Sequence, residues 1–271
     1  MGTLIDTELA LVEKATYEKY MGFVREAYGL GKDFHSAQVR YMMTFAHLAR
    51  ERGQSRNFLF IGGLGILGNL VNRLGEDAIL KWRGTKDLDL VLSNKSCSPL
   101  VSTIFDLVDV HGPSLSIPNK LSTRGCSVDG EGYSLPTTTV DTYIPKGSSD
   151  DGVIVQGKVL TEASFERAII SDFFGIPIPF CDPVDLLEMK LGITTSTQDP
   201  RRRDCADVLH LVSLSQRMGY TPESIRQFLS PLKRESLRRV LALASDSSTG
   251  FSHDLIYPPC SQPYKKELTR L

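Results

Sequence analysis

Apolar positions recur at helical spacing over the first fifty residues. Between residues 6 and 28 they return every three or four positions, and Gly29 follows as a stop signal. Residues 36–52 show the same spacing. We therefore expect two helices that form an N-terminal helical cover within residues 1–55.

Short apolar runs and helical patterns alternate in the next part of the chain. Residues 57–61 form an apolar, aromatic run that is typical of a buried strand, and residues 86–92 are the next strand candidate. The stretches 64–74 and 98–110 have helical spacing. This alternation predicts an α/β arrangement.

Residues 111–160 are rich in Gly, Ser, Thr and Pro, which favour loops and hairpins. The best strands within this segment are residues 137–144 and 153–159. The rest of the segment matches no pattern that we can name.

The chain after residue 181 is predicted to be entirely helical. Asp182 and Pro183 open a helix well, since aspartate caps free amides and proline suits the first turn. Three further helices fit residues 200–218, 221–229 and 232–244. The predicted fold is α/β (α+β), with residues 1–181 as one domain and residues 182–271 as a C-terminal helical domain.

Composition places the chain among globular proteins. Its 271 residues are 41% apolar and 23% charged, and its five cysteines contain no CxxC pair. The N-terminus lacks the basic start and apolar stretch of a signal peptide, and no segment approaches the ~20 apolar residues of a membrane span. We expect a cytoplasmic protein with no membrane partner.

Charge is unevenly distributed along the chain. Residues 61–200 carry 11 basic and 18 acidic side chains, whereas residues 201–271 carry 12 and 7. One interpretation is a solvated, uneven surface, and the other is a cation site followed by a surface that binds a polyanion. The basic candidates, which would otherwise simply cover helices, are Arg201, Arg202, Arg203, Lys233, Arg234, Arg238 and Arg239.

The strongest chemical signal is a pair of acids inside the strand at residues 86–92. Asp87 and Asp89 are two residues apart, so both side chains emerge on one face of the strand. Two like charges this close favour a bound cation. Mg²⁺ is often held by one or two carboxylates together with substrate phosphates. The pair therefore predicts a metal site, although two solvated acids on an edge strand have the same spacing.

Gly62 and Gly63 lie between the first strand and its following helix. A glycine turn at this place lets phosphates approach backbone amides and a helix N-terminus. Ligands in open α/β sheets bind at such strand ends, and the 24 residues from Gly63 to Asp87 allow both motifs to reach the same end. A purely structural turn is the alternative.

A third carboxylate, Asp141, belongs to the predicted strand 137–144. Beside the metal it would deprotonate an attacking hydroxyl or bind a second ion, as two-metal transfer requires. A surface acid on a strand is the other interpretation.

The helical half contributes a lysine and two aspartates. Lys190 ends an apolar helix, and Asp204 and Asp207 share one face at the start of the next. Lys190 would neutralise a triphosphate, and either aspartate would orient it through a salt bridge. The alternative is that the acids favour the helix dipole and the lysine is solvated.

In this order, the motifs resemble those of the AbiEii-type nucleotidyltransferases, which are toxins of type IV toxin-antitoxin systems, and of the related MenT toxins. The resemblance covers roughly residues 55–215. It rests on four motifs: Gly62-Gly63, Arg83-Gly-Thr85-Lys-Asp87-Leu-Asp89-Leu, Asp185-Leu-Leu-Glu-Met-Lys190 and Arg203-Asp204-Cys-Ala-Asp207-Val-Leu.

The resemblance implies a DNA polymerase β-like core with a mixed sheet, Mg²⁺ (or Mn²⁺) as cofactor and an NTP substrate. It also implies the 3′ end of tRNA as acceptor, and a cognate antitoxin protein as partner. By position, Gly62 and Gly63 match the phosphate-binding turn, Asp87 and Asp89 the metal ligands, and Lys190 the lysine that faces the nucleotide. Further matches are Arg83 and Thr85 before the metal strand, Asp204 or Asp207 in the following helix and, loosely, Asp141 as the third acid.

One departure concerns the glycine turn. Many members of the wider superfamily have Gly-Ser where this chain has Gly62-Gly63, so no serine hydroxyl is available here.

The sequence hypothesis is a Mg²⁺-dependent nucleotidyltransferase that acts as a toxin by modifying tRNA and blocking translation. Two alternatives stay open. One is a nucleotidyltransferase that modifies a protein or a small molecule such as an antibiotic, and the other is a non-catalytic module that only binds nucleotide.

Overall fold

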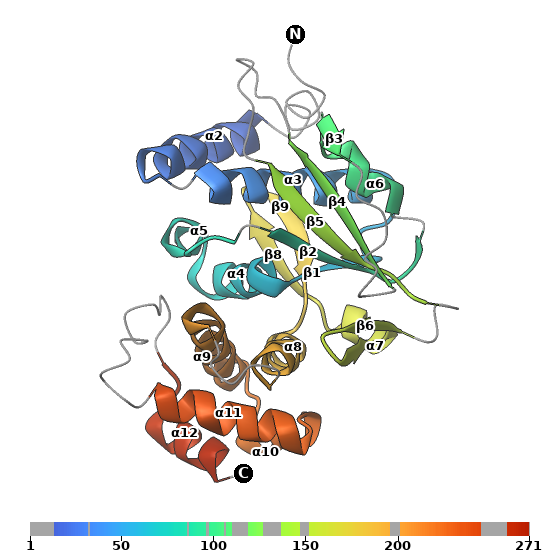
Figure 1. Ribbon diagram of the computed structural model, residues 1–271. Helices are drawn as coiled ribbons and strands as arrows, with labels where there is room; N and C mark the ends of the chain where they lie inside the picture. Colours follow the sequence, from blue (N-terminus) through green and yellow to red (C-terminus); the bar gives the residue numbers. More distant parts are fainter. Residues whose placement is uncertain are drawn as a thin grey trace.

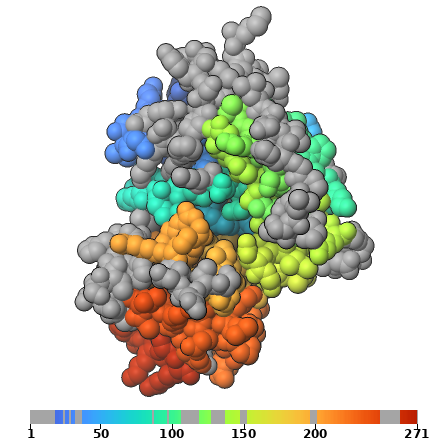
Figure 2. Space-filling model, in the orientation of Figure 1, coloured from blue at the N-terminus to red at the C-terminus, as the bar shows by residue number. Residues whose placement is uncertain are grey.

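The computed structural model describes residues 14–31, 33–85, 87–95, 98–105, 107–109, 119–126, 137–146, 152–195, 201–244 and 259–270. Figure 1 shows a sheet with helices packed around it and a group of helices from the C-terminal part below it. The same division is visible in the space-filling view, where the orange and red C-terminal helices form a block beneath the remainder of the molecule (Figure 2).

A seven-stranded mixed sheet forms the centre of the protein, with strand order β3-β4-β5-β2-β1-β9-β8. Strand β2 pairs antiparallel with β1 and parallel with β5, and β1 pairs parallel with β9. The strands are β1 (Phe58–Ile61), β2 (Asp87–Leu92), β3 (Leu107–Asp109), β4 (Lys120–Cys126), β5 (Thr138–Tyr143), β8 (Ile169–Phe173) and β9 (Ile176–Phe180). The predicted α/β class with a mixed sheet is confirmed.

The two N-terminal helices are α2 (Lys14–Gly29) and α3 (Asp33–Glu51). Helix α2 packs on α3, and α3 packs on β2 and β9. The aromatic ring of Phe45 on α3 meets Phe58 and Phe60 of β1 edge-on, so this helix covers the apolar sheet. The predicted helices are confirmed from residue 14 onward, and residues 6–13 lie outside the described part.

Helix α4 (Gly62–Leu74) begins directly after β1 and packs on β1, β2, β8 and β9. Its interior glycine, Gly68, lies against the ring of Phe180 in β9, where a Cβ atom would overlap the ring. Asn69 joins the helix to the end of β9, since its amide donates to the carbonyl oxygen of Cys181 at 2.9 Å. The short helix α5 (Asp77–Lys81), which leads towards β2, was not expected from the sequence.

The C-terminal part consists of α8 (Pro183–Thr195), α9 (Arg202–Arg217), α10 (Pro222–Phe228), α11 (Pro231–Leu243) and α12 (Gln262–Thr269). Helices α8 and α9 pack on α4, α11 packs on α8 and α9, and α12 packs on α10 and α11. The predicted caps are present, since Asp182 Oδ1 accepts the Val184 N–H at 2.8 Å and Thr221 Oγ1 accepts the Ser224 N–H at 3.1 Å. Helix α12 was not expected.

Three sequence expectations in the middle of the chain were wrong. The helix predicted at 98–110 ends at Thr103 (α6, Ser98–Thr103), and β3 follows because its residues pair with β4. The strand predicted at 153–159 is a hairpin, with β6 (Val153–Val155) and β7 (Lys158–Leu160) joined by a turn. Strand β4 lies in a segment expected to be mostly loop, because pairing with β5 outweighs its low β propensity.

A further helix, α7 (Glu162–Glu166), and the β8–β9 hairpin complete the fold between the β6–β7 hairpin and α8. The predicted domain boundary at residue 181 falls between β9 and α8. Apolar side chains from both sides of it belong to one buried cluster. None of the described helices is long and apolar enough to cross a membrane.

Candidate active site

The two acids of β2 lie where this strand begins. Asp87 is exposed and Asp89 is partly buried, whereas Leu88, Leu90 and Leu92 are buried. This alternation follows from the period of two in a strand, so both carboxylates share one face as the sequence indicated.

Gly62 lies directly against Asp89. Ile61 pairs with Asp89 across the antiparallel β1–β2 ladder, and the chain then turns into α4 at Gly62 with φ +61°. A Cβ atom at residue 62 would overlap the Asp89 Oδ2 atom. Glycine is therefore required here both for the left-handed backbone and for the close approach of the carboxylate.

The second glycine of the turn leaves room for a threonine. A Cβ atom at Gly63 would lie 2.9 Å from Cβ of Thr85. Thr85 precedes β2, and its hydroxyl donates to the carbonyl oxygen of Asp87 at 3.3 Å. The first turn of α4 thus packs closely on the residues that lead into the acid-bearing strand.

Asp141 lies beside Asp89. The two residues are direct partners in the parallel β2–β5 pair, so their side chains emerge on the same face. The Ser122 hydroxyl donates to Asp141 Oδ1 at 2.6 Å, and the Lys120 ammonium lies 2.5 Å from Oδ2. All three acids therefore lie on the neighbouring strands β2 and β5. Asp141 is held by Lys120 and Ser122 of β4.

A chain of ion pairs positions Lys190 of α8. Its Nζ atom lies 2.8 Å from Asp207 Oδ2 and 3.4 Å from Asp204 Oδ1, both on α9. Arg83 donates from one guanidinium nitrogen to both carboxylate oxygens of Asp207 at 2.8 Å. Asp207 is completely buried, so Lys190 and Arg83 provide the charges that balance it.

One cavity of about 70 Å³ joins these parts. Gly62 from α4, Asp89 from β2 and Lys190 from α8 all line it. The structure thus brings the glycine turn, an acid of the metal pair and the lysine to one place. Asp87, Asp141, Gly63 and Thr85 lie next to these residues along their strands and turn. Behind Lys190 lie Asp204 and Asp207, which contact it directly, and Arg83, which contacts Asp207.

The electrostatics of Asp89 reflect this crowding. Burial, together with the negative charges of Asp141 and Asp87, raises the pKa of Asp89 to about 6, against the opposing effect of Lys190 and Lys120. A cation at this place would relieve the repulsion among the three carboxylates.

The donor set fits a divalent ion that is completed by its substrate. Among the described residues there is no group of three or more His, Cys, Asp and Glu side chains arranged to hold a metal alone. Asp87 and Asp89 offer two carboxylates on one face, which is the number that Mg²⁺ uses when phosphates and water supply the remaining ligands. The pair fits Mg²⁺ in that mode.

Three solved structures resemble the chain. They are a candidate nucleotidyltransferase from Helicobacter pylori, an antigenic nucleotidyltransferase-like protein from Paracoccidioides brasiliensis, and JHP933 from Helicobacter pylori. Their sequence identities are 11%, 12% and 11%, and their TM-scores are 0.43, 0.43 and 0.37. The alignments cover 79%, 83% and 77% of this chain, and 84%, 95% and 86% of the other chains.

No protein-family model and no curated protein matches the sequence. Similarities this weak say nothing about substrate or partners, which have to be inferred from the side chains of the chain itself.

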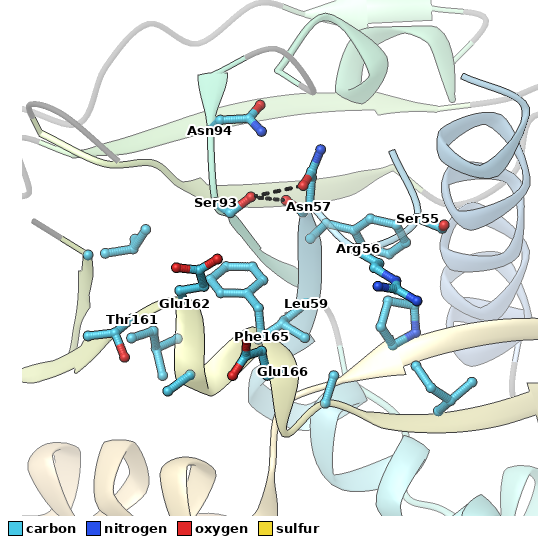
Figure 3. A pocket seen from close by; sticks show the side chains of 18 residues that line it. Ser55, Arg56, Asn57, Leu59, Ser93, Asn94, Thr161, Glu162, Phe165 and Glu166 are labelled. Carbon is cyan, nitrogen blue, oxygen red and sulfur yellow. Dashed lines mark hydrogen bonds between the residues drawn. The ribbon is translucent and has the colours of Figure 1, made fainter. Parts of the chain in front are cut away.

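A much larger cavity, of about 1160 Å³, opens at the other end of β1 (Figure 3). It lies between helix α7, the start of β1 and the residues that follow β2. In its wall, the Ser93 hydroxyl donates to the carbonyl and side-chain oxygens of Asn57 at 3.3 and 3.4 Å. The charged side chains at its rim, Arg56, Glu162 and Glu166, are exposed. None of the predicted site residues lines it, so size alone does not locate the chemistry.

Three residues near the acids were not found from the sequence. Tyr143 follows Asp141 by two positions on β5, so its place in the cavity was predictable from the strand period. Lys120 and Gln156 lie in the segment expected to be loops and hairpins, and no local pattern marks them.

The basic candidates of the C-terminal part are largely engaged within the protein. Intramolecular partners include Asp204 for Arg201, Glu188 for Lys233, Leu229 for Arg234, Glu235 for Arg238 and Thr194 for Arg239. Arg202 and Arg203 are exposed at the start of α9. The expected polyanion-binding surface therefore stays a prediction.

Proposed function

We propose that the protein is a Mg²⁺-dependent nucleotidyltransferase, which moves NMP from an NTP to an acceptor hydroxyl. The observation that carries this proposal is the meeting of Gly62, Asp89 and Lys190 in one cavity. A glycine turn at a helix start, strand carboxylates and a held lysine are the groups that a triphosphate and its metal require together.

The first turn of α4 would bind the β and γ phosphates. Backbone N–H groups at a helix N-terminus are unpaired within the helix and carry partial positive charge. The N–H groups of Gly62 and Gly63 would be the donors of this first turn, and the space at the Cβ position of each glycine is taken by Asp89 and Thr85.

Asp87 and Asp89 would hold Mg²⁺, which when bound offsets the phosphate charge and lowers the barrier to displacement at the α phosphorus. Lys190 adds a positive charge on the other side of the cavity, and Asp207 fixes its position. Arg83 holds Asp207 in turn. Catalysis of this kind depends mainly on positioning and electrostatic stabilisation.

Asp141 would take the proton from the acceptor hydroxyl. It is the strand neighbour of Asp89, and Ser122 and Lys120 hold both of its carboxylate oxygens. These contacts set the direction of the carboxylate before an acceptor arrives.

The acceptor that we propose is the 3′ end of tRNA, as the family resemblance implies, so that the protein would act as a toxin on translation. The exposed Arg202 and Arg203 support a polyanionic acceptor, because they lie within two turns of Asp204 and Asp207, which hold Lys190. A cognate antitoxin would be the protein partner.

The direct test of transfer uses each of the four NTPs, labelled at the α phosphate, with total tRNA and Mg²⁺. We expect label on RNA with the wild type and at least a hundredfold less with Asp87→Asn, the scale of a lost electrostatic group. Asp172→Asn is the matched control, since Asp172 is an exposed strand acid outside the site. Label on protein would replace RNA by a protein acceptor, and no label with any NTP would refute the proposal.

The toxin role has its own test. Induced expression of the wild type should stop growth, and expression of Asp87→Ala at the same level should not. Equal growth with both proteins would remove the toxin role and leave the transferase proposal to the labelling experiment.

A further inference from the structure

The turn between β6 and β7 holds a residue in an unfavourable backbone conformation. Val155 pairs with Lys158, and the two residues between them have φ values of +49° (Gln156) and +75° (Gly157). Two positive φ values define the type I′ hairpin turn, whose first position strongly prefers Asn, Asp or Gly. A glutamine there costs roughly 1 kcal/mol relative to glycine.

This turn reaches into the candidate active site. Gln156 lines the same cavity as Asp89 and Lys190, and Tyr143 is a further residue of its lining. Its carbonyl oxygen lies on Gly192 of α8, where a Cβ atom would overlap it. Both the turn and the helix are thus shaped to bring Gln156 to the cavity.

Ion pairs fix the hairpin on α8. Lys158, which follows the turn, lies 2.9 Å from Asp185 Oδ1 and 2.7 Å from Glu188 Oε2. Lys233 of α11 joins Glu188 at 3.0 Å, so the hairpin is held by a network and not by one contact. The backbone of this turn is therefore held against α8, and the exposed Gln156 is carried on a rigid support.

The chemistry of the surrounding wall differs from that of the phosphate end. Leu186, Met189 and Ile193 form one face of α8 in the cavity, and none of them carries charge. The Gln156 amide is neutral, and it both donates and accepts hydrogen bonds. Apolar walls with two neutral polar groups, the Gln156 amide and the Tyr143 hydroxyl, suit one edge of a nucleoside, whereas Asp89 and Lys190 suit the metal and the phosphates.

We propose that Gln156 hydrogen-bonds the nucleoside part of the bound NTP and thereby sets which nucleotide the protein prefers. This inference rests on the proposed nucleotidyltransferase function and assigns that site a specificity residue. It also gives a reason for a glutamine at a position where glycine is more stable.

The test exploits this conformational preference. Gln156→Gly removes the side chain and adopts the same φ without strain, so Tm should stay equal or rise. The kcat/KM ratio between the preferred and the least preferred nucleotide should fall at least tenfold, measured over the four NTPs and their 2′-deoxy forms.

The neighbouring residue provides the matched control. Gly157→Ala strains the same turn, because its φ is +75°, but places no new atom within 4 Å of the rest of the protein. It should lower Tm and leave the nucleotide ratio unchanged. An unchanged ratio in Gln156→Gly, or equal loss with every nucleotide, would overturn the inference while leaving the transferase proposal intact. A wild type that uses no NTP would overturn both.

Discussion

Asp89 and Gly62 are neighbours across the end of the β1–β2 pair, and the acid occupies the space that a side chain at residue 62 would need. The glycine turn and the acid-bearing strand are consequently one structural unit. Their closeness means that a phosphate at the start of α4 and a metal on β2 would be in contact.

A single methyl group added at residue 62 should push the Asp89 carboxylate away from the glycine turn. In Gly62→Ala, the new Cβ atom displaces the Asp89 carboxylate, and the positive φ adds strain of about 1 kcal/mol. We expect at least a hundredfold loss of transfer activity with a Tm only a few degrees lower. Activity within threefold of the wild type would show that Asp89 does not need its present position.

Asp207 should matter for stability as well as for activity. It is completely buried between Lys190 and Arg83, so Asp207→Ala removes the carboxylate partner of Arg83 and leaves Lys190 with only the longer contact to Asp204, and it should cost roughly 3 kcal/mol in the free energy of unfolding. Urea denaturation measures this loss. Lys190→Met should lose less stability, because Arg83 still pairs with Asp207, but at least as much activity. The reverse order of stabilities would contradict the proposed chain of ion pairs.

The packing of α4 on β9 predicts a steric defect for alanine at Gly68. Gly68→Ala inserts a methyl group into the ring of Phe180 and should destabilise the protein by about 1 to 3 kcal/mol. Gly22→Ala in α2 meets no atom within 4 Å and should raise stability by up to about 1 kcal/mol, since alanine is the better helix former. Thermal denaturation of both variants checks the sign of each change.

Lys158 predicts a pH dependence of stability. Burial by itself lowers the pKa of Lys158, but hydrogen bonds and negative charge from Glu188 and Asp185 outweigh it and raise that pKa above its ordinary value of 10.5. A raised pKa in the folded state means that the contribution is complete below pH 10.5 and is lost as pH rises through the folded value.

The matching variant is Lys158→Met. Its deficit in the free energy of unfolding should be about 1 to 2 kcal/mol at pH 8, because Arg167 and Lys233 still partner the two acids. The deficit should be the same from pH 7 to about 10 and shrink above that range. A deficit that grows with pH would show that the lysine does not act through its charge.

The positions of several candidate site residues could be predicted from the sequence where local patterns were strong. The period of two placed Asp87 and Asp89 on one face, and the glycine turn after an apolar run placed Gly62 at the start of a helix. Helices α8 and α10 of the C-terminal part followed from their cap residues. These signals are local, so one sequence suffices to see them.

What the sequence missed depends on contacts between distant segments. Strand β4 exists because it pairs with β5 and β3, and only that pairing brings Lys120 to Asp141. Gln156 reaches the cavity because α8 has a glycine 36 positions later, at residue 192. No local periodicity encodes such long-range pairings.

The most direct test of the account is the effect of Mg²⁺ on wild type and Asp89→Asn. In EDTA at pH 8, Asp89→Asn should have the higher Tm, because it removes repulsion with Asp141 and Asp87. Mg²⁺ with a nonhydrolysable NTP should raise Tm of the wild type and of the control Asp172→Asn, but not of Asp89→Asn. An equal rise in Tm for all three proteins would contradict a metal and nucleotide site at Asp87 and Asp89.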